Sequence, residues 1–282
     1  MDPEAFEGRR MDRVIAYYDG FDEWARLDTA EGRVEFRRMC ALIDRYVGPG
    51  SRLLDLGGGP GRYTLAMAER GHSCQLVDLS PRQVEIARTR IGGAFPDRIP
   101  PPVVGDAADL SGFATGSFDS VLAFGPFYHL TDPAARAAAA AECHRVLGPG
   151  GVLMAAFIPR IGGVAALIDR AARRPDQVSA AALRRAAETG VFENAGADGF
   201  PSGIYMTPEA ARDLLAGAGF ERVGTVSVRS VLYGREAAWG EIAARDPAMG
   251  EMLERLADEL AAVPEVVATG GPALAIGWTA GG

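Results

Sequence analysis

Residues 53–61 read Leu-Leu-Asp-Leu-Gly-Gly-Gly-Pro-Gly, an apolar run that ends in a glycine-rich turn. The run Arg52–Leu56 has the length of a short buried strand, and a helical pattern follows over 62–70. In a doubly wound sheet, a strand that enters such a turn and continues as a helix marks the place where a ligand meets bare backbone. The turn alone is weak evidence, because tight turns also use glycine for its backbone freedom.

The alternation of strand and helix continues as far as residue 158. Short apolar runs predict further strands at 74–78, 102–104, 118–124 and 152–158. Helices are expected from Pro81, where Ser80 supplies the N-cap, and over 133–147. Strand, helix and strand at this spacing predict an α/β fold with a parallel, doubly wound sheet and right-handed crossovers.

The charge composition narrows the chemistry. The chain has 282 residues, with 29 Lys+Arg against 37 Asp+Glu and a formal net charge of −8, and every one of the positive residues is arginine. The absence of lysine excludes a Schiff-base lysine, a pyridoxal-phosphate anchor and a phosphate-loop lysine. The acidic balance argues against a nucleic-acid partner, which requires a basic surface.

The cysteine pattern and the N-terminal segment indicate a soluble, cytoplasmic protein. The three cysteines, Cys40, Cys74 and Cys143, lie far apart and form no CxxC pair, so neither a disulfide framework nor a zinc ribbon is expected. Residues 1–10 include acidic residues where a signal peptide would have a basic region followed by an apolar stretch. No uncharged apolar run approaches the roughly 20 residues of a membrane helix, so no membrane partner is expected.

Three aspartates are predicted to share one edge of the sheet. Asp55 precedes the glycine turn, Asp78 ends the second strand and Asp106 follows the third. A dinucleotide fingerprint GxGxxG does not fit, because the positions that would need glycine hold Arg62 or Pro60. Asp55 would also repel a pyrophosphate by about 4 kcal/mol at close range. A cofactor with a sulfonium, an ammonium, a ribose and no phosphate reverses that sign, and S-adenosylmethionine is such a cofactor.

On these motifs, residues 52–158 resemble the class I S-adenosylmethionine-dependent methyltransferases, specifically the small-molecule group. The resemblance implies a seven-stranded Rossmann-like sheet. It also implies that the methionine moiety lies on Asp55, Gly57, Gly59 and Gly61, and that Asp78 holds both ribose hydroxyls. The remaining positions that match the family's cofactor site are Leu79, Asp106 and Ala107 around the adenine, and Phe124 and Gly125 beside the methionyl group.

The flanking segments are predicted to be mainly helical. Helices are expected at 12–27, at 33–47, on both sides of Pro175 within 161–189, at 207–217 and at 235–262, and strands at 221–231 and 273–279. We treat 1–282 as one domain with four parts, namely an N-terminal helical flap (1–50), a cofactor-binding core (51–159), a helical lid (160–206) and C-terminal strands and helices that complete the sheet (207–282). In such a lid, Phe192, Phe200 and Tyr205 would form an apolar wall, and the alternative for 160–206 is surface elaboration.

The N-terminal flap supplies two further candidates through the same resemblance. Tyr18 would cover the methionine end of the cofactor, and Arg33 or Arg37 would pair with its carboxylate. The alternative is that Tyr18 packs in the core and both arginines face solvent.

The loop after the fourth strand, Gly125-Pro126-Phe127-Tyr128-His129-Leu130, bears on the subclass. Methyltransferases that act on DNA amino groups carry Asn or Asp where this chain has Gly125. No acidic residue lies between Asp119 and Asp132, so no metal site is expected. His129 is the candidate catalytic base, and the alternative is a hydrogen-bonded loop histidine.

The sequence thus predicts a metal-independent enzyme that methylates a small molecule. An alanine- and arginine-rich chain without lysine is typical of GC-rich bacterial genomes, where such enzymes often modify secondary metabolites. One alternative is a non-catalytic S-adenosylmethionine-binding regulatory or assembly protein. The other is a nicotinamide-dependent oxidoreductase, which Arg62 and Asp55 disfavour.

Overall fold

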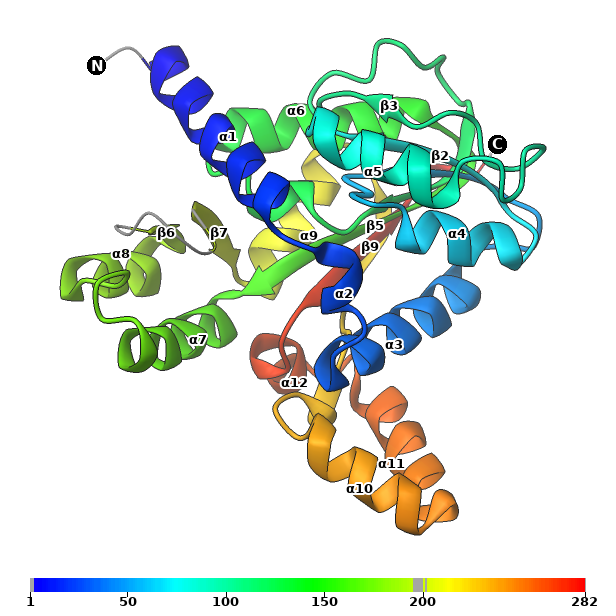
Figure 1. The fold of residues 1–282 in the computed structure, drawn as a ribbon. Coiled ribbons are helices and arrows are strands. Elements are labelled where there is room, and N and C mark those ends of the chain that lie inside the picture. The colour runs from blue at the N-terminus through cyan, green and yellow to red at the C-terminus, as the bar shows by residue number, and fades with distance from the viewer. Residues whose placement is uncertain (1–2, 195–199, 201, 282) are drawn as a thin grey trace.

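The computed structural model describes residues 3–194, 200 and 202–281, and its centre is a twisted sheet (Figure 1). Seven of its strands run side by side in the order β3-β2-β1-β4-β5-β9-β8, and only β9 runs against its neighbours. Their bounds are β1 Arg52–Leu56, β2 Ser73–Asp78, β3 Val103–Val104, β4 Phe118–Ala123, β5 Leu147–Pro159, β8 Glu221–Ser227 and β9 Ala273–Trp278. The predicted α/β fold class with a doubly wound sheet is confirmed, and these seven strands correspond to the seven that were predicted.

The chain adds a hairpin that the sequence did not predict. Strands β6 (Val191–Glu193) and β7 (Ser202–Met206) pair with each other, and β7 extends the sheet from the last two residues of β5, Ile158 and Pro159. Residues 195–199 and 201, which were assigned to the lid, lie outside the described residues.

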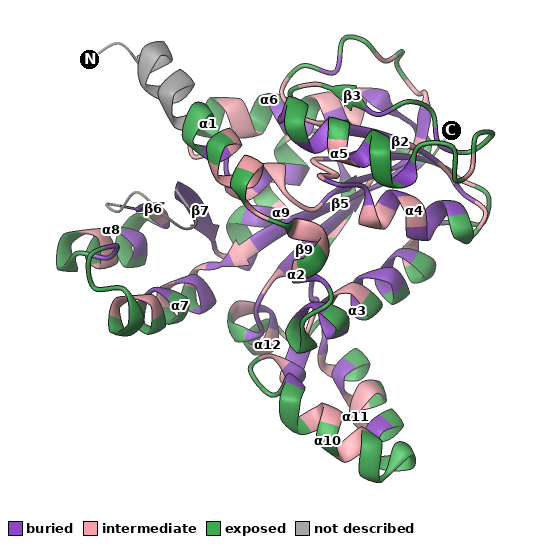
Figure 2. Ribbon diagram, viewed as in Figure 1, coloured by how far each residue is buried: buried purple, intermediate pink, exposed green. Residues whose placement is uncertain are grey.

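Helices cover both faces of the sheet because the strand residues alternate between two cores. Leu54 faces a core shared with α6 and α9, whereas Leu53 faces a core shared with α3 and α4. Figure 2 shows that central strands such as β5 and β9 are mostly buried between these layers, whereas the edge strand β3 is exposed. The covering helices are α3 Ala30–Tyr46, α4 Arg62–Glu69, α5 Pro81–Ile91, α6 Pro133–Val146 and α9 Pro208–Gly217.

The helix predicted at 12–27 in the N-terminal flap is divided into two helices in the structure. Helix α1 (Pro3–Gly20) ends at Gly20, and Asp22 then caps the short helix α2 (Glu23–Arg26) by accepting from the amide of Ala25. Thr29 caps α3 in the same way, through the amide of Gly32. These caps turn the chain twice, so that α1 and α2 cross the carboxyl edge of the sheet (Figure 1).

A small lobe follows β5 and contains α7 (Arg160–Arg173), α8 (Ala180–Thr189) and the β6–β7 hairpin. Its core holds Phe192 stacked on Tyr205, with ring centroids 6.2 Å apart. Gly163 allows α7 to lie against the Tyr205 ring, because an added Cβ would come within 2.5 Å of it. Two of the three aromatic residues predicted to line the lid therefore pack inside the lobe instead.

The C-terminal part contains α10 (Glu236–Arg245), α11 (Pro247–Leu260) and α12 (Pro264–Thr269), with a short 3-10 turn at Ser230–Leu232. A second 3-10 turn, Pro126–Tyr128, lies in the loop after β4. The helix predicted over 235–262 is interrupted because Asp246 caps α11 and Pro247 occupies its first position. The strand predicted over 221–231 ends at Ser227, and Ser230 takes a positive φ of 51°. Within the described residues, no helix combines the length and apolarity needed to cross a membrane.

Candidate active site

A cavity of about 360 Å³ lies at the carboxyl ends of the parallel strands. The residues that line it come from the ends of β1, β2, β4 and β5, from the turn after β3 and from the flap. Strand β1 lies next to both β2 and β4, and the order of the strands reverses at this point of the sheet. Such a switch point is the expected place for a ligand in an open α/β sheet.

The glycine turn forms one wall of the cavity. Gly57 and Gly59 have φ values of 71° and 52°, which side chains other than glycine rarely adopt. A Cβ on Gly59 would meet only the Gln83 side chain, at 4.0 Å, so it would enter the cavity. A Cβ on Gly58 would come within 2.8 Å of the Asp55 carboxylate. The turn therefore presents bare backbone to the space that a ligand would fill.

Asp78 lies beside this turn at the end of β2. Its Oδ2 accepts from the Gly59 amide at 2.8 Å, and its Oδ1 accepts from the Ser80 amide at 2.9 Å. Burial raises the pKa of Asp78, and the two backbone hydrogen bonds oppose that rise. Each carboxylate oxygen accepts one backbone hydrogen and keeps a further lone pair, so the group fits a pair of ribose hydroxyls.

Asp55 is more deeply buried, with 1% of its surface exposed. Its Oδ2 accepts from the Thr64 hydroxyl at 2.6 Å. Burial is the main cause that raises the pKa of Asp55 to about 6, and the hydrogen bond from Thr64 opposes it. A carboxylate with so little solvation favours a neighbouring cation, such as a sulfonium or an ammonium.

The other positions that the resemblance assigned to the cofactor mostly line the same cavity. Asp106 caps the turn after β3 through the amide of Ala108. The remaining lining positions of this set are Leu79, Ala107, Phe124 and Gly125. The structure therefore brings together the three aspartates that the sequence placed at one edge.

Two of the assigned residues do not line the cavity. Gly61 is buried behind the turn, where a Cβ would come within 2.5 Å of the Ile91 side chain, so its role is to let α4 pack against α5. Arg33 is exposed on the outside of α3 and donates to the Asp28 carbonyl. Its alternative, Arg37, pairs with Glu254 and stacks on Trp239. The helix pattern showed that both arginines are on α3, but it did not show which face of α3 turns to the site.

Tyr18 and His129 meet at the edge of the cavity. The Tyr18 hydroxyl lies 2.9 Å from Nε2 of His129, and Nδ1 of His129 lies 3.2 Å from the Ser202 carbonyl of β7. Because a carbonyl only accepts, Nδ1 carries the hydrogen, and in the neutral ring Nε2 accepts from Tyr18. Burial raises the pKa of Tyr18 well above 10, so its hydroxyl stays protonated.

Helix α1 is attached to the cofactor side of the cavity through α5. Ser80, whose backbone donates to Asp78, also donates from its hydroxyl to the Asp19 carboxylate at 2.6 Å. The Gln83 side chain donates to the Tyr18 carbonyl. The position of Tyr18 is therefore tied to residues that adjoin the predicted ribose site.

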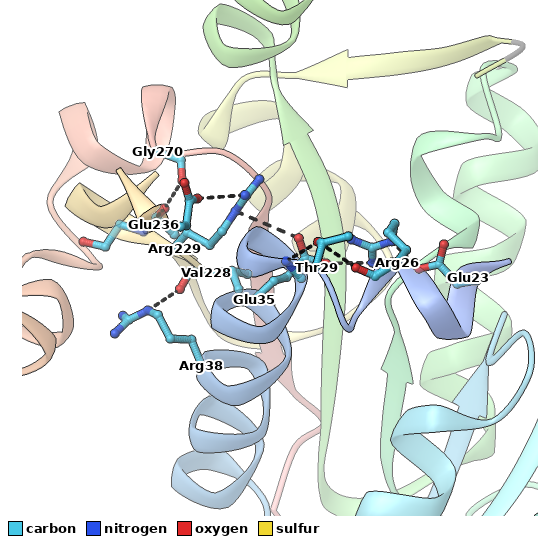
Figure 3. Close-up of polar contacts among 12 residues, drawn as sticks. Glu23, Arg26, Thr29, Glu35, Arg38, Val228, Arg229, Glu236 and Gly270 are labelled. Carbon is cyan, nitrogen blue, oxygen red and sulfur yellow. Dashed lines mark hydrogen bonds and ion pairs between the residues drawn. The ribbon is translucent and has the colours of Figure 1, made fainter. Parts of the chain in front are cut away.

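A chain of paired charges, which the sequence did not reveal, forms another end of the cavity (Figure 3). Arg26 pairs with Glu23 at 2.7 Å and with Glu35 at 2.8 Å, and these two partners raise its pKa against the effect of burial. Farther from the cavity, Arg229 lies 3.9 Å from Glu35 and 2.8 Å from Glu236. Within the described residues, no group of three or more His, Cys, Asp or Glu side chains is arranged to hold a metal ion.

Known proteins with related sequences carry methyltransferase names. Residues 54–155 match the family described as a methyltransferase domain. The chain is 30% identical over 139 residues to the magnesium-protoporphyrin O-methyltransferase of Rhodobacter capsulatus, a match that covers 43% of this chain and 58% of that protein. It is 33% identical over 131 residues to a ubiquinone biosynthesis O-methyltransferase of Xanthomonas campestris, covering 46% and 52%. The chain thus spans little more than half the length of these curated relatives.

Solved structures share the fold over nearly the whole chain. One is the 1,6-didemethyltoxoflavin-N1-methyltransferase of Burkholderia thailandensis, crystallised with bound 1,6-didemethyltoxoflavin and S-adenosylhomocysteine. The TM-score is 0.55 at 18% identity, and the match covers 99% of this chain and 91% of that chain. At this identity the likeness establishes the fold and leaves the reaction to be argued from the site.

Proposed function

We propose, on the premise that residues 54–155 form a class I S-adenosylmethionine-dependent methyltransferase domain, that this chain transfers a methyl group from S-adenosylmethionine to a small-molecule acceptor without a metal ion. One observation carries the proposal. The bare Gly59 backbone and the Asp78 carboxylate share one wall of the cavity, 2.8 Å apart, and the buried Asp55 lies close behind them. That wall offers acceptors to a ribose and negative charge to a cation. Among the described residues that line the cavity, the arginines are Arg26 and Arg62, and both are already paired with carboxylates, so they do not offer a site for a pyrophosphate.

The cofactor, when bound, supplies an electrophilic methyl group on a cationic sulfur that is a good leaving group. The protein then has to align the acceptor, exclude water and remove a proton where the acceptor begins protonated. We assign the proton to the Tyr18–His129 pair. Because the Tyr18 hydroxyl stays neutral, Tyr18 passes its hydrogen to Nε2 of His129 while its oxygen receives the proton of the acceptor.

An oxygen atom is the nucleophile that we favour. The two curated relatives described above are both named O-methyltransferases. A paired tyrosine and histidine can also accept the proton that a hydroxyl must lose. An amine that arrives neutral can attack the methyl group without a base. We further propose a secondary metabolite as the natural acceptor and the bacterial cytoplasm as the location, on the composition and cysteine pattern of the chain.

The four-part division of the chain also belongs to the proposal. The lobe of α7, α8, β6 and β7 would serve as the helical lid that was predicted at residues 160–206. Phe200 lines the cavity, and the Ser202 carbonyl contacts His129. The flap contacts the same lobe, since Arg13 of α1 donates to the Asn194 carbonyl at 3.2 Å. Closure of lobe and flap together would exclude water from the reaction.

Titration calorimetry of the purified chain with S-adenosylmethionine, S-adenosylhomocysteine and NAD tests the proposal. We expect binding of the first two and none of NAD. Preferential binding of NAD would replace the proposal with the oxidoreductase alternative. Binding of S-adenosylmethionine with no release of S-adenosylhomocysteine across a broad acceptor panel would favour the non-catalytic alternative.

A further inference from the structure

The cavity extends beyond the part that the cofactor would occupy. The three aspartates assigned to the cofactor stand on β1, β2 and after β3, which lie on one side of β4, whereas β5 lies on the other side. On the β5 side the lining residues come from α1, the loop after β4, β5 itself and Phe200. We call this part the acceptor chamber. The inference about this chamber rests on the proposed function, which assigns the cofactor to the opposite side of the cavity.

The acceptor chamber is uncharged. None of its described lining residues is Asp, Glu or Arg, and most are apolar or aromatic, such as Ile15, Tyr17, Tyr128, Ile158 and Phe200. Its aromatic rings also contact one another. Phe200 lies with its ring centroid 5.0 Å from that of His129 and 6.2 Å from that of Tyr128. Ring faces at these separations favour a flat aromatic ligand over an aliphatic one of the same size.

The cations elsewhere in the cavity are already paired. Among the described lining residues, the arginines are Arg26 and Arg62. Arg26 is held by Glu23 and Glu35, and Arg62 is held by Asp28 at 2.7 Å and by the Trp24 carbonyl at 2.9 Å. A phosphorylated or carboxylated acceptor would therefore enter an apolar chamber without a counter-charge, which is costly.

Two of the polar groups that line the chamber can together accept a proton. The Tyr18 hydroxyl and Nε2 of His129 lie 2.9 Å apart at its edge. From this combination we infer that the acceptor is an uncharged, planar aromatic molecule with a hydroxyl group, a phenol in chemical terms. The phenol oxygen forms the new C–O bond, and the C–S bond of S-adenosylmethionine breaks with its electron pair on sulfur. The hydroxyl proton goes through Tyr18 to His129.

Binding to the chain loaded with S-adenosylhomocysteine tests this inference without turnover. The probes form a matched set of equal ring size: 2-naphthol, the saturated decahydro-2-naphthol, 2-naphthyl phosphate and 2-naphthylmethylamine. Calorimetry should give 2-naphthol an affinity at least about tenfold above that of each of the other three, because the other probes lack the ring faces or carry a charge. Equal or tighter binding of the phosphate, the amine or the saturated alcohol would overturn the inference, as would no binding of 2-naphthol.

A positive charge introduced into the chamber gives a second measurement. Ile15 lines the chamber on α1 and is half-buried, so Ile15→Arg adds a cation there. The variant should bind 2-naphthyl phosphate about tenfold more tightly and 2-naphthol more weakly, with unchanged affinity for S-adenosylhomocysteine. Ile168→Arg, on the exposed face of α7 at 57% exposure, is the matched control and should change neither.

The two levels of the proposal fail in different ways. If no variant and no wild-type protein binds S-adenosylhomocysteine, the proposed function falls and this inference falls with it. If S-adenosylhomocysteine binds but Ile15→Arg leaves the ranking of the four probes unchanged, the chamber is not the acceptor site, and the proposed function stands.

Discussion

The hydroxyl of Tyr18 and Nε2 of His129 lie 2.9 Å apart, although 111 residues separate them in the chain. Tyr18 belongs to the flap, and its backbone is held by Gln83 beside the predicted ribose site. His129 belongs to the loop after β4, and Ser202 of the lobe holds its other nitrogen. Three hydrogen bonds thus join the flap, the core and the lobe, so the Tyr18–His129 pair is complete only when all three are in place.

Loss of the Asp78 carboxylate should weaken cofactor binding. Two ribose hydroxyls would lose a charged acceptor, and hydrogen bonds to charged groups are worth roughly 1.5–3 kcal/mol each before compensation by water, so we expect Asp78→Ala to weaken S-adenosylmethionine binding by roughly 2–4 kcal/mol. Calorimetry at a fixed salt concentration measures this change in binding free energy. Circular dichroism should show that the fold survives.

Asp106→Ala is the matched comparison on the next strand. Asp106→Ala would remove one contact to the adenine amino group, so this variant should lose less affinity for S-adenosylmethionine than Asp78→Ala. A larger loss in Asp106→Ala would mean that the roles of the two carboxylates are exchanged. Unchanged affinity in Asp78→Ala, with the fold intact, would remove Asp78 from the site.

Asp55 should lower the stability of the cofactor-free protein at neutral pH. Its pKa is about 6 in the folded chain against 3.8 as the ordinary value. The folded state therefore binds the proton more tightly than the unfolded state, and stability falls as the pH rises from about 4 to about 6. The difference between these two pKa values corresponds to about 3 kcal/mol of stability.

Asp55→Asn should remove that loss, because the neutral amide oxygen still accepts from the Thr64 hydroxyl. Urea unfolding of the cofactor-free protein at pH 4, 5, 6 and 8 measures it, and the variant should be the more stable protein above pH 6. The same variant should bind S-adenosylmethionine more weakly. Asp97→Asn, at an exposed loop position, is the control and should follow the wild-type pH curve. If the stability of Asp55→Asn changed with pH in the same way as that of the wild type, Asp55 would not be the titrating group.

Exchange of backbone hydrogens should report on the lobe as a lid. If the lobe closes over the cavity, exchange over 160–194 and 202–206 should slow when S-adenosylhomocysteine and a bound acceptor analogue are both present. Mass spectrometry of peptic fragments follows it, with α11 as an internal reference far from the cavity. Slower exchange around the glycine turn without any change in the lobe would make the lobe surface elaboration.

The glycine turn and the strand-end aspartates were predictable because they depend on local backbone chemistry. A positive φ at Gly57 and Gly59 and a carboxylate at the end of each strand leave a signature at fixed spacing. Residues 54–155 match the family described as a methyltransferase domain, in agreement with the family resemblance. The predicted strand at 52–56 coincides with β1 in both of its bounds.

The features that were missed depend on tertiary packing. The chain turns at Asp22 and again at Thr29, which places Arg26 at the cavity and Arg33 in solvent. The helical spacing of apolar residues over 12–47 does not predict these turns. The β6–β7 hairpin is short, and β7 is buried on both sides, so it lacks the alternation that identifies a strand. The contact between Gly61 and Ile91 joins two helices that no local pattern relates.

His129 carries the last and most demanding prediction. If the acceptor is a phenol or another hydroxyl, His129→Ala should lower the turnover number by roughly 10²–10⁴, the usual effect of a positioned base, with cofactor affinity within about twofold of wild type. The plot of rate against pH should lose its acidic limb, because that limb reports protonation of the base and the variant has no imidazole there. Tyr18→Phe is the matched variant: it keeps the ring but removes the hydroxyl that joins His129 to the acceptor, so it should lower turnover while keeping the acidic limb. A neutral amine as acceptor would shrink both effects to a few-fold, since alignment alone would then supply the rate. Full activity of His129→Ala from pH 6 to 9 would leave His129 as the residue that anchors Tyr18 to Ser202 and nothing more.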